Sequence, residues 1–173
     1  MSFLIMGKIL IAPNHEEING PLIFLAGPTE GVHDWQSEAI GFFQINPNIS
    51  VASPRRGIEK QSDIGGKKYR EQFEWERLYL EYAARHGVVM FWLPKSTENI
   101  EQSSYAHTFL FELGEFVTRY SSEKFRIVVG IEKEFPEERF IREMLAFKIP
   151  DVPISNNLND TCGRVLEMAI GLR

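Results

Sequence analysis

The sequence has 173 residues, of which 43% are hydrophobic and 25% charged, and its net charge is −5. These proportions are typical of a globular protein with a real core, so we expect residues 1–173 to form a single domain. Because duplex nucleic acid and anionic membranes attract basic surfaces, the negative charge argues against both as partners.

Cysteine usage and the N-terminal segment exclude further classes of protein. Cys162 has no second cysteine for an intramolecular disulfide, and no residues show the spacing of a metal site. The apolar run Phe3–Ala12 is interrupted by Lys8, is too short to span a bilayer and lacks the layout of a signal peptide. We therefore expect a cytoplasmic protein that needs no metal or other cofactor.

Apolar runs alternate with helix-type patterns along the chain. A short edge strand is possible within residues 8–13, and the continuous apolar run Leu22–Ala26 is typical of a strand buried on both faces. Asp34 is a candidate N-cap for the first helix, and a strand follows at Ile49–Ala52. A polar stretch then extends to about Arg70, and its length is typical of a functional or mobile loop. The remaining predicted elements are a helix at Glu71–Arg85, a strand at Val88–Leu93, a helix within Ser103–Tyr120, a strand at Phe125–Val129, a helix at Pro136–Phe147, a short strand at Val152–Ile154 and a helix at Leu158–Ile170.

This alternation predicts an α/β fold of right-handed βαβ units, with helices on both faces of a parallel sheet. Five strands suggest a flavodoxin-like, doubly wound sheet in the order 2-1-3-4-5. Ligands of such sheets bind beyond the carboxyl ends of the strands, where strands 1 and 3 diverge. Gly27, Pro28 and Thr29 end strand 1, and Pro94 ends strand 3, so these segments should flank a binding site.

Glu112 is the candidate catalytic residue at that site. It lies between apolar residues near the start of its helix, where the helix dipole favours an ionised carboxylate. It could therefore serve as a fixed nucleophile. Alternatively, Glu112 belongs to a solvated helix face together with the i,i+4 pair Glu115–Arg119.

Several motifs together resemble the nucleoside 2-deoxyribosyltransferase-like family, from about Leu22 to about Val129. They are F-L-A-G-P at Phe24–Pro28, Trp35, S-P-R-R at Ser53–Arg56, Trp75-Glu76, and F-E-L-G-E-F at Phe111–Phe116 after a strand that ends F-W-L-P. The resemblance implies a flavodoxin-like fold and a small nucleoside or nucleotide substrate. In the family, the glutamate of the E-L-G motif attacks the sugar, and here that residue is Glu112.

The implied reaction forms a glycosyl ester on Glu112 and passes the sugar to another base or to water. Glu76 is the candidate for the second acidic group, which protonates or holds the departing base. Glu74 and Asp63 are alternative candidates. Without a catalytic role, Glu74 and Glu76 would belong to an exposed helix face. The chain departs from the family pattern at Phe24 and Gly87, where members often carry Tyr and Asp. This departure favours the alternative of a nucleotide-binding module without turnover. A flavin-binding relative is a weaker alternative, because the phosphate loop rich in Ser and Thr is missing.

Further residues are candidates for substrate binding. Trp35 and Trp92 could stack on a base, although tryptophan in such patterns is more often part of the core. Arg55 and Arg56 could bind a 5′-phosphate or could pair with acidic residues of their own loop, Glu59 and Asp63.

The start of the Glu112 helix offers hydrogen-bond donors. Ser104, His107 and Thr108 could donate to a sugar hydroxyl or a phosphate there. His107 could also act as an acid–base group, although a lone histidine is more often a capping or surface residue.

The family resemblance also implies assembly, since members complete their sites with residues of a neighbouring subunit. Four aromatic residues on the two helices around the site exceed what one sheet face is expected to cover; they are Tyr79, Tyr82, Phe116 and Tyr120. We therefore expect a homodimer or a higher closed oligomer with Glu112 near the interface.

Overall fold

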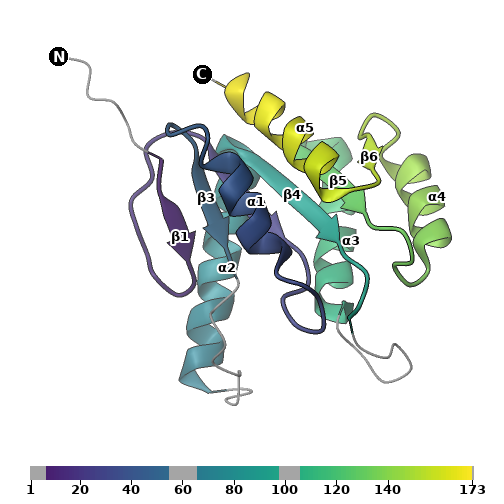
Figure 1. The fold of residues 1–173 in the computed structure, drawn as a ribbon, viewed down its shortest axis with the longest axis horizontal. Helices are drawn as coiled ribbons and strands as arrows, with labels where there is room; N and C mark the ends of the chain where they lie inside the picture. The colour runs from purple at the N-terminus through teal and green to yellow at the C-terminus, as the bar shows by residue number, and fades with distance from the viewer. Residues whose placement is uncertain (1–6, 55–65, 98–105, 173) are drawn as a thin grey trace.

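The computed structural model describes residues 7–54, 66–97 and 106–172 (Figure 1). The candidate residues Arg55, Arg56, Asp63 and Ser104 lie outside these ranges. The elements are β1 (Ile9–Ile11), β2 (Leu22–Ala26), α1 (Trp35–Phe43), β3 (Ser50–Ser53), α2 (Lys67–His86), β4 (Val88–Leu93), α3 (His107–Glu123), β5 (Ile127–Ile131), α4 (Glu138–Lys148), β6 (Ile154–Ser155) and α5 (Leu158–Ile170).

The strands form one six-stranded sheet in the order β1-β3-β2-β4-β5-β6, and every neighbouring pair is parallel. The predicted α/β, flavodoxin-like class is confirmed, and β3-β2-β4-β5-β6 reproduces the predicted order 2-1-3-4-5. The predicted number of five strands is wrong. The short N-terminal segment is a full member of the sheet, because Ile9 pairs with Val51 of β3 and extends the sheet at that edge.

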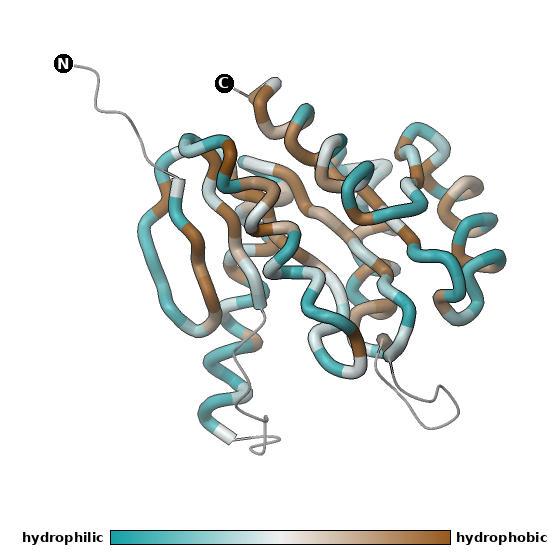
Figure 2. Tube along the Cα trace, in the orientation of Figure 1, coloured by the Kyte–Doolittle hydropathy of each residue, from teal (hydrophilic) through white to brown (hydrophobic). Residues whose placement is uncertain are grey.

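Helices cover both faces of this sheet (Figure 1). One core cluster joins the sheet to α2 and α3 through residues such as Phe24, Trp75 and Phe116, all almost fully buried. The other joins it to α1 and α5 through residues such as Trp35 and Cys162. Because both faces are covered, the central strands β2, β4 and β5 are almost entirely hydrophobic, whereas the helices alternate in character (Figure 2).

Capping side chains mark the starts of α1 and α5. Asp34 caps α1 as predicted, since its side chain accepts a hydrogen bond from the backbone N–H of Ser37 at 3.2 Å. Asn157 caps α5 in the same way, and that helix has the predicted bounds. In contrast, α2 begins at Lys67 rather than at Glu71, so the polar stretch before it is shorter than expected.

The aromatic residues that suggested an uncovered surface are accounted for within the chain. Tyr79 and Phe116 are buried, and Tyr82 and Tyr120 pack partly buried against the same core cluster. The expectation that these four exceed one sheet face was therefore wrong. The segment after β1 supplies part of the cover, since the Tyr79 hydroxyl donates to the Glu16 carbonyl at 3.0 Å.

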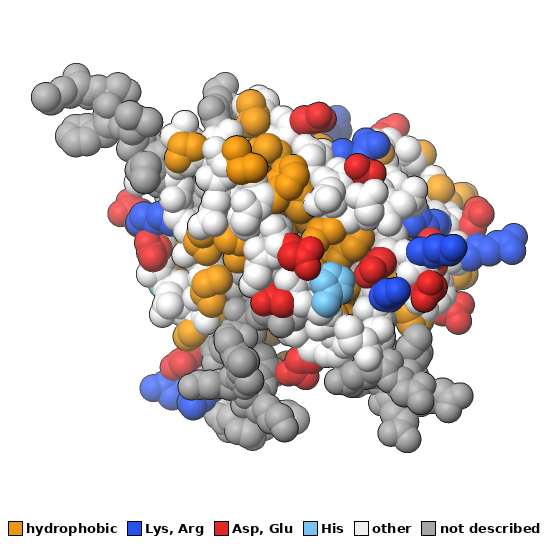
Figure 3. Space-filling model, viewed as in Figure 1, with side chains coloured by type: hydrophobic (Ala, Val, Ile, Leu, Met, Phe, Trp, Pro, Cys, Tyr) orange, Lys and Arg blue, Asp and Glu red, His pale blue; other side chains and the backbone are white. Residues whose placement is uncertain are grey.

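None of the helices within the described ranges combines the length and the apolar character needed to cross a membrane. On the face covered by α1 and α5, acidic and basic side chains are interspersed with apolar ones (Figure 3).

Candidate active site

Glu112 lies on α3 where this helix faces α2, and its side chain is mostly shielded from water. The pKa of Glu112 is raised to about 7, mainly by burial and in addition by the negative charge of Glu76 on α2. Arg77 opposes this effect, while Glu115 adds to it. Glu112 is therefore a carboxyl group that changes its protonation near neutral pH.

The raised pKa corrects the expectation that the helix dipole keeps Glu112 ionised. Helix α3 begins at His107, which places Glu112 in the second turn. The effect of the dipole falls off within the first turn, whereas the cost of desolvating a charge acts wherever the side chain is buried. At this position burial outweighs the dipole.

Glu76 is held in place by its own helix. Gln72, one turn earlier on α2, is 7% exposed and donates from its amide nitrogen Nε2 to Oε1 of Glu76 at 2.6 Å. The same nitrogen donates to the carbonyl oxygen of Pro54 at 3.2 Å, directly after β3. Glu76 is half-buried, whereas its alternative Glu74 is exposed. Of these two glutamates, Glu76 is the one beside Glu112.

A network of ion pairs fixes α2 against α3. Arg77 binds Glu115 through two hydrogen bonds of 2.8 and 3.0 Å, a geometry typical of strong arginine–carboxylate pairs. Arg119 pairs with Glu115 at 2.9 Å and with Glu81 at 2.6 Å. The predicted Glu115–Arg119 pair is thus present as part of a larger interhelical network. Among the described residues, Glu112 joins none of these ion pairs.

The segment after β2 is pinned against the segment after β4. The indole Nε1 of Trp35 donates to the carbonyl oxygen of Pro28 at 2.9 Å. The backbone N–H of Thr97 and the hydroxyl of Ser96 donate to the carbonyl oxygen of Gly31 at 2.8 and 3.1 Å. Consequently Gly27, Pro28 and Thr29 lie at the carboxyl edge of the sheet, as expected.

Gly27 is required sterically at this edge. A Cβ atom there would lie 2.5 Å from the backbone oxygen of Trp92 and 2.6 Å from the ring of Trp35. Both tryptophans are core residues, 0% and 1% exposed. Their burial contradicts the suggestion that they offer a ring face to a base, because the sheet and the helices already cover them.

His107 and Thr108 are exposed on the first turn of α3. They precede Glu112 by five and four residues, so Thr108 lies one turn before it. The placement is compatible with the donor role suggested for them. Within the described ranges, no cluster of three or more His, Cys, Asp or Glu side chains is arranged to hold a metal ion.

The two departures from the family pattern have different structural settings. Phe24 is 2% exposed, and its ring centroid lies 6.2 Å from that of Trp75, the neighbour of Glu76. Gly87 precedes β4 and so lies at the opposite, amino edge of the sheet, where a Cβ atom would collide with the backbone of Leu22. Packing in this chain therefore requires a residue without a side chain at position 87.

Gln72 and Arg77 were missed by sequence reasoning. The only sequence signal for Gln72 is its i,i+4 spacing to Glu76, which is a common pattern on helices. The signal for Arg77 is weaker still, since its partner Glu115 lies 38 residues away.

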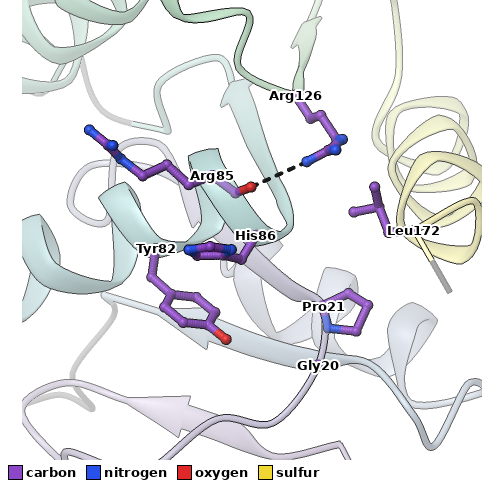
Figure 4. A pocket seen from close by; sticks show the side chains of 7 residues that line it. All are labelled: Gly20, Pro21, Tyr82, Arg85, His86, Arg126 and Leu172. Atoms are coloured by element: carbon purple, nitrogen blue, oxygen red, sulfur yellow. Dashed lines mark hydrogen bonds between the residues drawn. The ribbon is translucent and has the colours of Figure 1, made fainter.

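An open hollow of about 370 Å³ lies at the amino edge of the sheet, away from Glu112 (Figure 4). It is lined by Gly20, Pro21, Tyr82, Arg85, His86, Arg126 and Leu172. Arg126 donates to the carbonyl oxygen of Arg85 at 3.3 Å, in the last turn of α2. Its guanidinium thus donates to a backbone carbonyl that has no partner within the helix. This hydrogen bond accounts for the position of Arg126, so no bound ligand is needed to explain a cation here.

Comparison with known proteins agrees with the geometry. A family model described as nucleoside 2-deoxyribosyltransferase like matches residues 20–135, well over half of the chain. The match includes β2 to β5 and both Glu76 and Glu112. Among curated proteins, no significant match to the chain was found.

Proposed function

Because the chain belongs to the nucleoside 2-deoxyribosyltransferase-like family, we propose that it cleaves or exchanges the N-glycosidic bond of a nucleoside or nucleotide, with Glu112 as nucleophile. The observation that carries this proposal is the position of Glu112. It is a shielded carboxyl group on a helix that starts at the carboxyl edge of the sheet, beside a second carboxyl group. This edge is where doubly wound sheets bind their ligands.

In the first half of the reaction, a carboxylate oxygen of Glu112 attacks the anomeric carbon. The new C–O bond forms as the C–N bond breaks, and the electron pair of that bond leaves with the base. Glu76 supplies the proton that the departing base nitrogen takes up. In the second half, an acceptor base or a water molecule attacks the same carbon and gives up its proton to the ionised Glu76. The C–O bond to Glu112 breaks at the same time, so both carboxyl groups return to their starting forms.

Two neighbouring carboxyl groups cannot easily both be ionised, so they titrate as a pair. Below about pH 7 Glu112 holds a proton, because its pKa is raised to about 7. The reactive arrangement has this proton on Glu76 and the charge on Glu112. The pair thereby provides the acid and the nucleophile at the same time.

The test is base release or base exchange with a panel of deoxynucleosides, their 5′-phosphates and free bases, read by chromatography. We expect Glu112→Gln to fold normally and to lose about 10³-fold or more of the rate, since it removes the nucleophile. Glu143→Gln, an exposed change on α4, is the control and should keep full activity. Activity retained in E112Q would leave Glu112 with a structural role.

The form of the substrate is a second point of the same experiment. Arg55 and Arg56 are our candidates for binding a 5′-phosphate, as they directly follow Pro54 and β3. Preference for nucleotides over nucleosides in the panel would support this assignment. Equal rates on both forms would contradict it.

One observation favours the alternative, a nucleotide-binding module without turnover. Phe24 offers no hydroxyl beside Trp75 and Glu76, where family members often carry tyrosine. Calorimetric binding of a nucleoside without any base release would support this alternative.

We also propose that residues 1–173 form one domain, since all six strands share a sheet and each face has a core cluster. The cytoplasmic location stays a prediction from the sequence, and localisation of a tagged protein in cells would test it.

A further inference from the structure

Gln72 is an unusual residue for its position. Its side chain is 7% exposed, on the side of α2 that faces the end of β3. Burying an amide is costly unless its polar atoms are hydrogen-bonded, and the Oε1 atom of Gln72 has no partner among the described residues. A leucine would fill a similar volume without this cost, so the amide needs an explanation other than packing.

The donor side of the amide is fully used. Nε2 carries two hydrogens and lies 2.6 Å from Oε1 of Glu76 and 3.2 Å from the carbonyl oxygen of Pro54. A backbone carbonyl only accepts hydrogen bonds, and so does an ionised carboxylate. The amide orientation with Nε2 toward these two atoms is therefore the one that satisfies both, and the flipped orientation would oppose oxygen to oxygen.

We propose that Gln72 is a positioning residue, which holds the carboxyl group of Glu76 toward Glu112 by occupying Oε1 as an acceptor. This proposal deepens the proposed function and rests on it. With Oε1 occupied by a donor, the proton of a protonated Glu76 resides on Oε2. Gln72 thereby selects the oxygen atom from which the departing base receives its proton.

The charged groups that face Glu112 determine what the loss of Gln72 does. From α2 these are Glu76 and Arg77, and from α3 itself Glu115. Arg77 and Glu115 are fixed to each other by two hydrogen bonds and do not depend on Gln72. Glu76 is half-buried and its negative charge raises the pKa of Glu112, so a Glu76 carboxylate that no longer receives the hydrogen bond from Gln72 should raise this pKa less.

The experiment measures the titration of Glu112 directly, by carbon-13 NMR of protein labelled at the glutamate carboxyl groups. The resonance is assigned as the one absent from E112Q. In the unaltered chain its midpoint should lie near pH 7. In Gln72→Leu we expect the midpoint to fall by about one pH unit, because the neighbouring charge moves away.

Three further variants complete the test. Gln72→Met keeps the shape of the side chain without a donor, and it replaces Q72L if that variant does not fold. Glu76→Gln should lower the midpoint in the same direction, and Q72L should add little in the E76Q background, since both act through one carboxylate. Glu71→Gln removes an exposed charge from the same helix and should leave the midpoint unchanged.

A midpoint that is unchanged or higher in both Q72L and Q72M would overturn the proposal. This result is independent of turnover. If the midpoint falls in these variants while the unaltered protein acts on no nucleoside, the positioning role stands and the proposed function fails.

Discussion

At the residue scale, the environment of Glu112 determines its pKa. A glutamate in solution has lost its proton well below pH 7, whereas burial and the charge of Glu76 raise the pKa of Glu112 to about 7. Perturbed carboxyl groups of this kind are concentrated at functional sites, although ion-pair networks produce them as well. Here the ion-pair network lies beside Glu112 and does not include it.

The pH dependence of the reaction follows from this pair. If the active form holds one proton on Glu76, kcat/KM should fall about tenfold per pH unit above a midpoint near pH 7, because the last proton of the pair is lost there. The measurement is a pH–rate profile on the best substrate of the panel, together with the same profile for Glu76→Gln. The descending limb should be absent from E76Q.

The opposite sign would be informative in a different way. A rate that rises through pH 7 would show that ionisation of Glu112 limits the reaction. In that case the proton of the departing base comes from a group other than Glu76.

The sequence singled out the candidate catalytic residues where a motif carried them. Glu112 and Glu76 were identified from the F-E-L-G-E-F and Trp75-Glu76 motifs, and the structure places them beside each other. The pKa of Glu112 could not be foreseen, since it depends on burial and on a partner helix. The complete burial of Trp35 and Trp92 likewise depends on tertiary packing, which the sequence does not show.

At the scale of elements, α2 and α3 act as one unit. They run in the same direction, both starting at the carboxyl edge of the sheet, and the pairs Arg77–Glu115 and Arg119–Glu81 join them. Arg119 also lies over the rings of Phe116 and Phe125, at 5.3 and 4.7 Å from their centroids. Because these ion pairs join the two helices, they help to keep Glu76 and Glu112 next to each other.

Alanine substitution at two glycines of α2 and α3 should change the free energy of unfolding in opposite directions. Gly87 ends α2, and an added Cβ atom would collide with the backbone of Leu22. We expect Gly87→Ala to lower the free energy of unfolding by about 2 kcal/mol or more, as overpacking does. Gly114 lies exposed on α3, and beyond its own helix backbone a Cβ atom there meets none of the described residues within 4 Å. We expect Gly114→Ala to raise the free energy of unfolding by about 0.5–1 kcal/mol.

Chemical denaturation of both variants measures these changes, and each variant serves as the control for the other. A neutral G87A would contradict the close approach of Gly87 to Leu22. Because Gly114 belongs to the E-L-G motif, activity of G114A should be measured as well. A more stable but less active variant would indicate that something outside the chain approaches this surface.

Element boundaries were predicted well where caps and apolar runs mark them. The bounds of β2, β4 and α5 agree with the sequence prediction, while β5 begins two residues later than expected and α2 four residues earlier. The first residues of α2 are Lys67, Lys68 and Tyr69, and no side chain caps the helix. Without an N-cap residue the sequence contains no signal for this start.

At the scale of the whole molecule, the order of five strands followed from the alternation of strands and helices. The sixth strand, β1, was named only as a possible edge strand within residues 8–13, because it has just three residues. Such a short strand is stable only through its pairing with β3. Pairing partners of this kind are not visible in a local pattern.

The apolar surface of the molecule bears on assembly. The aromatic residues that first suggested an oligomer are packed within the chain, but others are exposed. Phe73 on α2 is 53% exposed and Phe111 on α3 is 82% exposed. Each lies one turn before a member of the Arg77–Glu115 pair, so the two residues stand at corresponding positions on these parallel helices. Tyr69, one turn before Phe73, is 51% exposed and extends the same patch.

We predict that this patch, formed by Tyr69, Phe73 and Phe111, is the contact of a homodimer or a higher closed oligomer. Phe111 precedes Glu112 in the chain, so such a contact would bring a second copy close to the candidate active site. Sedimentation at micromolar concentration should show a species larger than 20.0 kDa. Phe111→Ser should shift it to the monomer and lower turnover, because it removes the most exposed ring of the patch. Phe147→Ser, which removes an equally exposed ring from α4, is the matched control and should change neither property. A 20.0 kDa species with full activity on a nucleoside would refute a shared site, and dissociation by F147S rather than F111S would move the contact to α4.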